Sequence, residues 1–297
     1  MSEMNAAHKR ELDSTGYVVI DGFIQGDELS QLREAAAAAE QLTRSHRWPH
    51  RRVVGKQFPP WSDADTPDSW GVQHLMHPQL RLPQFRAFYA NTRLTALAAG
   101  LIGCDEGALQ MELFNMLILP AKTSFNLSWH RDHVNHAIEA EAEEQALRVP
   151  HYGIQFNAPL YDDGCLWVVP GSHRQVRNHI QRELSCNTLP TTNPALMPHA
   201  KQVHLKAGQI LFYNANILHC AAYPQSPPAP ARATLHGSFG DANGGSERAV
   251  GVLQHGLEWM KEPSFGDGPG RHMWLRLLDM YEKAGWDEKG GKFSLTE

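Results

Sequence analysis

Between residues 108 and 240 the sequence is a series of short apolar segments separated by turns, and this pattern constrains the fold most. Breaks such as "PGSHR" at 170–174 end these segments, most of which are short enough to be a single strand, while 207–224 contains a turn, a strand and the start of a second strand. The clearest segments are 108–120, 151–160, 207–224 and 231–240. Many short strands at such spacing are typical of an antiparallel barrel or sandwich. We therefore expect a mainly β protein.

Helical patterns precede and follow this β-rich region. Residues 26–42 open with Asp27 and Glu28, which are favourable at the positive end of a helix dipole, and continue with a run of alanines. Residues 93–103 form a second helical pattern that stops at a glycine, and the tail containing "HMWLRLLDMYEKAG" is a third. A short buried strand is expected at 16–24, before the first helix.

Residues 44–80 lack a regular apolar period and are rich in proline, tryptophan and charge. A long stretch of this kind inside a compact protein is typical of a functional lid or a poorly ordered segment. We expect one domain over 1–297. It would comprise an N-terminal strand, helix and lid at 12–107, a β core at about 108–240 and a C-terminal helical extension at 241–297.

Composition and charge exclude several classes of function. The formal net charge is −5, so the chain lacks the broad basic surface that nucleic-acid binding requires. No apolar run approaches the roughly 18 residues of a membrane span, and the first residues lack the apolar segment of a secretory signal. The four cysteines form no CxxC pair, which favours free thiols in a reducing compartment. We expect a cytoplasmic protein without nucleic-acid or membrane partners, and the sequence leaves its oligomeric state open.

The segment "SWHRDHVNH" at 128–136 is the strongest chemical signal. In a strand, residues two apart point to the same face, so His130 and Asp132 would converge on one side. They are two of the three ligands of a 2-His-1-carboxylate triad, which leaves positions open on iron(II). His219, at the end of an apolar strand, fits the missing ligand. Arg232, on the next expected strand, could hold a carboxylate through two parallel hydrogen bonds.

Other interpretations of the same segment stay open at this stage. His133 or His136 could join His130 in a zinc site. Catalytic zinc sites, however, usually place paired histidines one helix turn apart, and the nearby proline and aromatic residues argue against a helix. Asp132 could also be an ordinary turn residue. The ordered set of HxD, "PGSHR", a strand histidine and a strand arginine favours the iron triad.

This ordered set resembles the phytanoyl-CoA dioxygenase family of iron(II)- and 2-oxoglutarate-dependent oxygenases. The resemblance extends from about residue 12 to about residue 240. It is carried by "GYVVIDGF" near the start, "SWHRD" at 128–132, "DDGCLWVVPGSHR" at 162–174, "GQILFYNANILHCA" at 208–221 and "ARATL" at 231–235. It implies a double-stranded β-helix core, which is a jelly-roll or cupin-like arrangement of two sheets with the metal at one mouth, and flanking helices.

The resemblance also assigns roles to individual residues. It implies that His130, Asp132 and His219 are the metal ligands. Arg232 falls on the position that binds the far carboxylate of 2-oxoglutarate, and Thr234 is expected on the same strand face and could assist it.

Two further residues are candidates for lining the cosubstrate pocket. Asn157 lies in "QFNAPL", where family members often have a polar or aromatic residue, and Met116 lies on the strand that leads to HxD. The sequence departs from the family pattern in the long segment 175–206 and in residues 241–297, which match nothing in it.

The implied activity is hydroxylation of an unactivated C–H bond of a small-molecule substrate. The reaction would use Fe(2+), 2-oxoglutarate and O2 and release succinate and CO2. Asp132 favours hydroxylation, because halogenating relatives have a small residue at its position. Desaturation, epimerisation or cyclisation with the same cofactors, in natural-product tailoring, stays open. A zinc-dependent hydrolase and a non-catalytic binding module are the less favoured alternatives.

The basic segment 44–56 carries the only cue to the substrate. It could meet a phosphate or carboxylate of the substrate, or form a solvated charged loop; its cations are Arg44, Arg47, Arg51, Arg52 and Lys56. Trp48, Trp61 and Trp70 could form an apolar lid over the site or anchor the loop.

Overall fold

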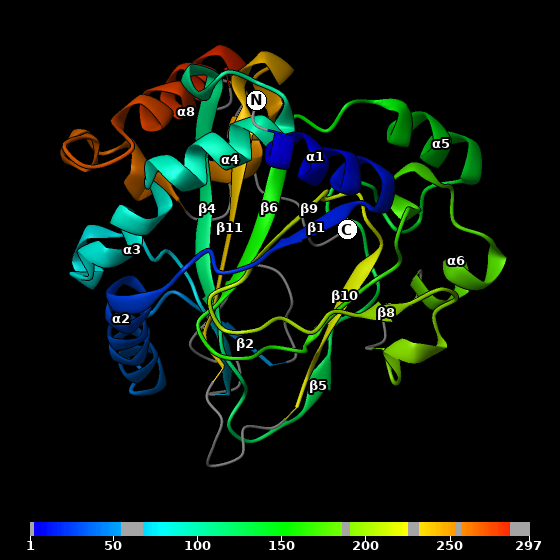
Figure 1. Cartoon of the computed structure of the whole chain (residues 1–297), viewed down its shortest axis with the longest axis horizontal. Coiled ribbons are helices and arrows are strands. Elements are labelled where there is room, and N and C mark those ends of the chain that lie inside the picture. Colours follow the sequence, from blue (N-terminus) through cyan, green and yellow to red (C-terminus); the bar gives the residue numbers. More distant parts are fainter. Residues whose placement is uncertain (1–2, 55–67, 186–190, 225–231, 254–256, 286–297) are drawn as a thin grey trace.

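The computed structural model describes residues 3–54, 68–185, 191–224, 232–253 and 257–285. Two antiparallel sheets make up its centre, and helices gather against one side of the larger sheet (Figure 1). Apolar side chains of both sheets meet in one buried cluster, in which Tyr17, Leu211 and Tyr213 pack against Leu166 and Val168. The two sheets therefore pack face to face.

The larger sheet has seven strands in the order β1-β9-β6-β11-β4-β3-β2, and every neighbouring pair is antiparallel. Its strands are β1 (Tyr17–Ile20), β2 (Arg51–Val53), β3 (Ser69–Val72), β4 (Leu109–Leu117), β6 (Gly153–Pro159), β9 (Ile210–Tyr213) and β11 (Thr234–Asp241). The smaller sheet has the order β5-β10-β7-β8. Its strands are β5 (Phe125–Asn126), β7 (Leu166–Val168), β8 (Lys201–Gln202) and β10 (His219–Tyr223).

Eight α-helices lie in the described part of the chain. They are α1 (Glu3–Thr15), α2 (Gly26–Arg44), α3 (Pro83–Tyr89), α4 (Thr92–Ile102), α5 (Ala140–Arg148), α6 (His179–Ser185), α7 (Glu247–Leu253) and α8 (Arg271–Ala284). Local sequence sets the ends of α4: the Asn91 side chain accepts from the Arg93 amide, and Gly103 ends the helix at φ 92°. None of these helices combines the length and apolar character needed to cross a membrane.

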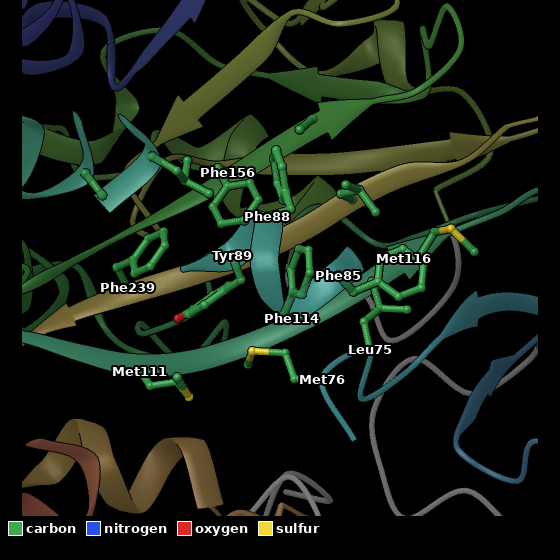
Figure 2. Close-up of a cluster of buried hydrophobic side chains, with 14 of the residues drawn as sticks. Leu75, Met76, Phe85, Phe88, Tyr89, Met111, Phe114, Met116, Phe156 and Phe239 are labelled. Carbon is green, nitrogen blue, oxygen red and sulfur yellow. The ribbon is translucent and has the colours of Figure 1, made fainter. Parts of the chain in front are cut away.

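The larger sheet has an apolar outer face and a more polar inner face. Its outward phenylalanines pack against helix α3 in the cluster of Figure 2, which contains Phe85, Phe88, Tyr89, Phe114, Phe156 and Phe239. Side chains alternate along a strand, so the neighbours of Phe156 on β6, Gln155 and Asn157, point the other way, between the sheets. The space between the sheets therefore receives the polar residues of these strands.

These observations confirm the expected mainly β fold with flanking helices and a double-stranded β-helix core, although the described strands form no closed barrel. The larger sheet also takes β1, β2 and β3 from outside the expected core of 108–240. In the expected lid, Trp48 and Trp70 are buried at 4% and 1% exposure, so they anchor the segment. Trp61 lies outside the described residues.

Replacing Phe156 by alanine should lower the free energy of unfolding by about 3–5 kcal/mol. The ring is fully buried and contacts the rings of Phe88, Phe114 and Phe239, so its removal leaves a cavity that the sheet cannot close. Urea denaturation measures this loss. Val149→Ala is the control, because Val149 is 62% exposed and its truncation should change stability by about 0.5 kcal/mol or less. Equal effects of the two substitutions would contradict the assignment of the core.

Candidate active site

The three expected metal ligands meet at one point of the fold. Ligand atoms of His130, Asp132 and His219 all lie within 4.8 Å of one another. Nε2 of His130 is 3.5 Å from Oδ1 of Asp132, and Nε2 of His219 is 3.7 Å from Oδ2. The side chains of His130 and Asp132 are 17% and 25% exposed, so a ligand can reach the cluster. Two imidazoles and one carboxylate with open access are a donor set that suits iron(II).

A backbone pairing between two distant segments builds this cluster. The amide of His130 donates to the carbonyl of His219 and the amide of His219 donates back, both at 3.0 Å. The amide of Asp132 donates to the carbonyl of Ala215, also at 3.0 Å. Strand β5 ends at Asn126, and His130 forms an isolated bridge beyond it. The expected continuous strand through "HRD" is therefore wrong, although the turn still brings both side chains to His219.

Hydrogen bonds to backbone carbonyls orient both imidazoles. Nδ1 of His130 lies 2.7 Å from the carbonyl oxygen of Ser128, and Nδ1 of His219 lies 2.9 Å from that of Ile217. A carbonyl can only accept, so each Nδ1 carries the proton and donates it. In the neutral imidazole, each Nε2 then keeps a lone pair directed at the cluster, which is how metal-binding histidines are usually held.

The cluster shifts the pKa of each of its members. Burial, assisted by the His130 imidazole, lowers the pKa of His219 to about 4. Burial alone would raise the pKa of Asp132, but the imidazoles of His219 and His130 hold it well below its ordinary value. Burial lowers the pKa of His130, and the hydrogen bond and charge of Asp132 outweigh this and raise it. The carboxylate is thus ionised at neutral pH, as a metal ligand must be.

A relay of two further side chains holds the Asp132 carboxylate. Nε2 of Gln155 donates to Oδ2 of Asp132 at 2.6 Å, and the hydroxyl of Tyr213 donates to Oε1 of Gln155 at 2.7 Å. Gln155 lies on β6 and Tyr213 on the adjacent β9, opposite each other in the register. The larger sheet therefore fixes the orientation of a ligand that the HxD turn supplies.

Arg131 lies between the two ligands of the HxD turn and enters a buried ion-pair network. Its Nε donates to Glu143 at 3.1 Å, and this carboxylate, with a side chain 0% exposed, also pairs with Arg177 and Arg182. A second donor of Arg131, Nη1, binds the carbonyl of Ser172 at 2.7 Å. This network anchors the turn from the side away from the metal ligands. Sequence reasoning missed it because its members are scattered charges with no shared spacing.

Arg232 and Thr234 share a buried carboxylate. Nε of Arg232 donates to Oδ2 of Asp163 at 2.9 Å, and the hydroxyl of Thr234 donates to the same oxygen. The guanidinium also lies 4.7 Å from the ring centre of Tyr223. Nη1 of Arg232 is buried and has no hydrogen-bond partner within the described residues. That orphaned donor is what a carboxylate-binding position requires before its ligand is present.

The two remaining pocket candidates differ in where they lie. Asn157 is on the inner face of β6, where its Oδ1 is 2.9 Å from Nδ1 of His236 on β11. Met116 lies in the apolar cluster on the outer face, near Leu75 and Phe85 in Figure 2, and its side chain is fully buried there. The expectation that Met116 lines the pocket is therefore wrong, because β4 turns this residue toward the helices.

Neither alternative zinc ligand joins the cluster. The ring of His133 packs against that of His151 with centroids 4.6 Å apart. Within the residues that the structure describes, the group with metal-ligand geometry contains His130, Asp132 and His219, and neither His133 nor His136 belongs to it. The arrangement thus favours the iron triad over the zinc site.

Two antiparallel sheets with a histidine–aspartate–histidine cluster define the class of cupin-like mononuclear iron oxygenases. A family model described as phytanoyl-CoA dioxygenase matches residues 12–229, and the chain therefore belongs to the phytanoyl-CoA dioxygenase family. This is a family of iron(II)- and 2-oxoglutarate-dependent dioxygenases, which confirms the expected family, enzyme class and cofactors. A comparison with curated protein sequences found no match.

Several solved structures share the fold at low sequence identity. EctD from S. alaskensis with bound Fe has a TM-score of 0.55 and 19% identity, covering 82% of this chain and 78% of that chain. The epimerase SnoN, from nogalamycin biosynthesis and in complex with Fe3+ and alpha ketoglutarate, has a TM-score of 0.52 and 20% identity, covering 80% and 84%. EvdMO1 has a TM-score of 0.53 and 18% identity, and the match covers 80% of this chain and 50% of EvdMO1. At these identities the similarity concerns the fold.

Removing the charge of Glu143 should destabilise the protein and weaken the metal site. In Glu143→Gln three guanidiniums lose a common buried counter-ion, so we expect a loss of about 3–5 kcal/mol in the free energy of unfolding. Urea denaturation and a metal titration measure the two effects. Glu144→Gln is the matched control, because Glu144 is 55% exposed and pairs with an exposed arginine. Unchanged metal affinity in a folded Glu143 variant would contradict the anchoring role.

The metal-free protein should lose stability as the pH falls below about 6.5. Burial lowers the pKa of His219 to about 4 and that of His236 to about 3, so the folded chain keeps both imidazoles neutral. The unfolded chain takes up these protons near pH 6.5 and therefore binds more of them between pH 6.5 and 3. Stability is fully present above this window and declines through it. Urea denaturation midpoints, measured with a metal chelator at several pH values, should show this decline. The midpoint should fall less steeply with pH in His236→Gln than in the control His204→Gln, because His204 is exposed.

Proposed function

We propose that this chain hydroxylates an unactivated C–H bond of a small molecule, using iron(II), 2-oxoglutarate and O2. The observation that carries the proposal is the convergence of His130, Asp132 and His219 within 4.8 Å. The orphaned buried Nη1 of Arg232 supports it, since it offers an unused donor to the second carboxylate of the cosubstrate. Both features match the donor chemistry that the family requires.

His130, Asp132 and His219 would hold the metal through two Nε2 atoms and one carboxylate oxygen. The hydrogen bonds of both Nδ1 atoms and the Gln155–Tyr213 relay would keep these ligands in place without further reorganisation. When bound, iron(II) and 2-oxoglutarate supply the oxidising power for hydroxylation, with release of succinate and CO2.

Arg232 would bind the far carboxylate of 2-oxoglutarate, and Thr234 would assist it by donating its hydroxyl proton to Asp163, the partner of Arg232. Asp163 already accepts hydrogen bonds from both residues. Burial raises the pKa of Asp163, but the charge of Arg232 and these hydrogen bonds outweigh burial, so the pKa lies below its ordinary value. The paired guanidinium is thus fixed in position and keeps Nη1 for the ligand. Asn157 would line the same space through its contact with His236.

The same site could direct other outcomes, because the fate of the substrate depends on its pose. SnoN is an epimerase and SnoK a carbocyclase, and both share this fold. Epimerisation or cyclisation with the same cofactors is therefore the second candidate function, ahead of desaturation. We further propose that the enzyme is cytoplasmic and acts on a small-molecule substrate. The net charge of −5 supports the absence of a nucleic-acid partner.

Two substitutions test the proposed site. His219→Ala should abolish tight iron(II) binding, because it removes a ligand on β10. Arg232→Met should keep iron but weaken 2-oxoglutarate binding about 10- to 100-fold, which is the effect of losing a charge-assisted hydrogen bond. Anaerobic titrations that follow the visible charge-transfer band of the iron–cosubstrate chelate measure both.

His133→Ala is the matched control, since His133 lies beside the cluster without belonging to it. It should bind iron and 2-oxoglutarate as the wild type does. Loss of metal in His133→Ala with metal retained in His219→Ala would instead establish the zinc site. A wild-type protein that binds iron and no 2-oxoglutarate would refute the proposed function, and one that binds both but releases no succinate would favour a non-catalytic module.

A further inference from the structure

Arg52 on β2 directs its side chain to the same face of the larger sheet as Thr234 on β11. Residues opposite each other in antiparallel strands face the same side, and the register links Arg52 to Gly71, Gly71 to Leu117 and Leu117 to Thr234. The stem of Arg52 lies over Gly71, where an added Cβ would come within 3.2–3.4 Å of three of its carbons. Glycine at this position therefore leaves the room that the arginine stem occupies.

The guanidinium of Arg52 has an aromatic neighbour, and no carboxylate of the described residues pairs with it. It lies 5.1 Å from the ring centre of Trp70, and within the described parts of the chain its buried Nε has no hydrogen bond. Trp70 in turn lies 5.1 Å from Tyr223, whose ring lies 4.7 Å from the Arg232 guanidinium. Two aromatic rings thus connect the two arginines, one of which is paired with Asp163 and one of which is not.

Two of the three groups whose charge acts on Arg52, Asp132 and Tyr213, belong to the metal end of the site. Burial lowers the pKa of Arg52, and the opposing influences come from Tyr223, Asp132 and Tyr213. The positive charge of Arg52 also lowers the pKa of His130 and of His236. Arg232, by contrast, responds to Asp163 and to Cys165 and Tyr223 beside it. Tyr223 thus acts on both guanidiniums, Asp132 and Tyr213 act on Arg52, and Asp163 acts on Arg232.

A charge count shows what Arg52 adds. Arg232 and Asp163 cancel each other, and a divalent metal with Asp132 leaves one positive charge. Arg52 supplies a second, and together they match the two negative charges of 2-oxoglutarate. An unpaired cation in a poorly solvated site is costly unless a ligand anion compensates it.

We propose that Arg52 is a second cosubstrate-binding residue, which binds the carboxylate at the keto-acid end of 2-oxoglutarate while Arg232 binds the far one. This inference rests on the proposed function. It assigns a role to the N-terminal hairpin of β2 and β3, which adds to the sheet beside β4.

Equilibrium binding of two ligands tests the assignment without turnover. 2-Oxobutanoate has the same keto-acid end as 2-oxoglutarate and lacks the far carboxylate. With iron(II)-loaded protein under anaerobic conditions, Arg52→Met should raise the Kd of both ligands about 10- to 100-fold. Arg232→Met should raise the Kd of 2-oxoglutarate alone. Arg52→Lys should recover most of the affinity, and Arg10→Met, which removes an exposed charge from α1, should have no effect.

The outcomes separate the two proposals. Wild-type protein that fails to bind 2-oxoglutarate refutes the proposed function itself. Wild-type binding with an unchanged Kd in Arg52→Met overturns the role of Arg52 alone, and an effect on 2-oxoglutarate without one on 2-oxobutanoate overturns the assignment to the keto-acid end. Thermal unfolding of the ligand-free variants adds a structural check: removal of an unpaired cation should leave the Tm equal or higher, whereas a merely structural arginine would lower it.

Discussion

The antiparallel pairing of His130 with His219 is the interaction on which the site depends. Two backbone hydrogen bonds of 3.0 Å join segments that are far apart in the sequence, in an isolated bridge beyond the pairing of Ala222 with Asn126. The register of the smaller sheet therefore sets the separation of the metal ligands. A slip by one residue would turn His219 to the opposite face of β10, and the three metal ligands would no longer lie together.

A hydrogen bond on one side and a buried ion-pair network on the other hold the HxD turn, which carries the other two ligands. On the ligand side, the uncharged amide of Gln155 fixes the ionised Asp132 carboxylate with one hydrogen bond of 2.6 Å. On the far side, Arg131 enters a buried network around Glu143, where charge compensation must offset the desolvation of several ions. Such networks add little stability relative to an apolar core of the same volume, although removing one partner is costly, and they tolerate few alternative geometries. Their value here is positional, because metal binding depends on where the turn lies.

Sequence patterns predicted the strands and the three clustered ligands because both rest on local spacing and on an ordered motif. Asp163, Gln155 and Glu143 were out of reach, since each acts through a partner that only the tertiary fold brings near. Met116 shows a second limit. Strand β4 is buried on both faces, so its sequence does not alternate regularly between apolar and polar residues. The pattern therefore does not show that Asn115 faces inward and Met116 outward. The direction of a residue on such a strand follows from register, which the sequence does not display.

The contrast between Arg232 and Arg52 indicates how the fold divides stability from binding. Arg232 is completed by Asp163 within the folded chain, so its charge is compensated before any ligand arrives. Among the residues that the structure describes, Arg52 is held through its stem over Gly71 and its guanidinium beside Trp70, contacts that position a cation without neutralising it. A chain selected for stability alone has no reason to keep such a group on an edge strand. Local departures of this kind from good pairing occur where a site is prepared for a ligand, and this one lies on the inner face of the sheet that also presents Thr234.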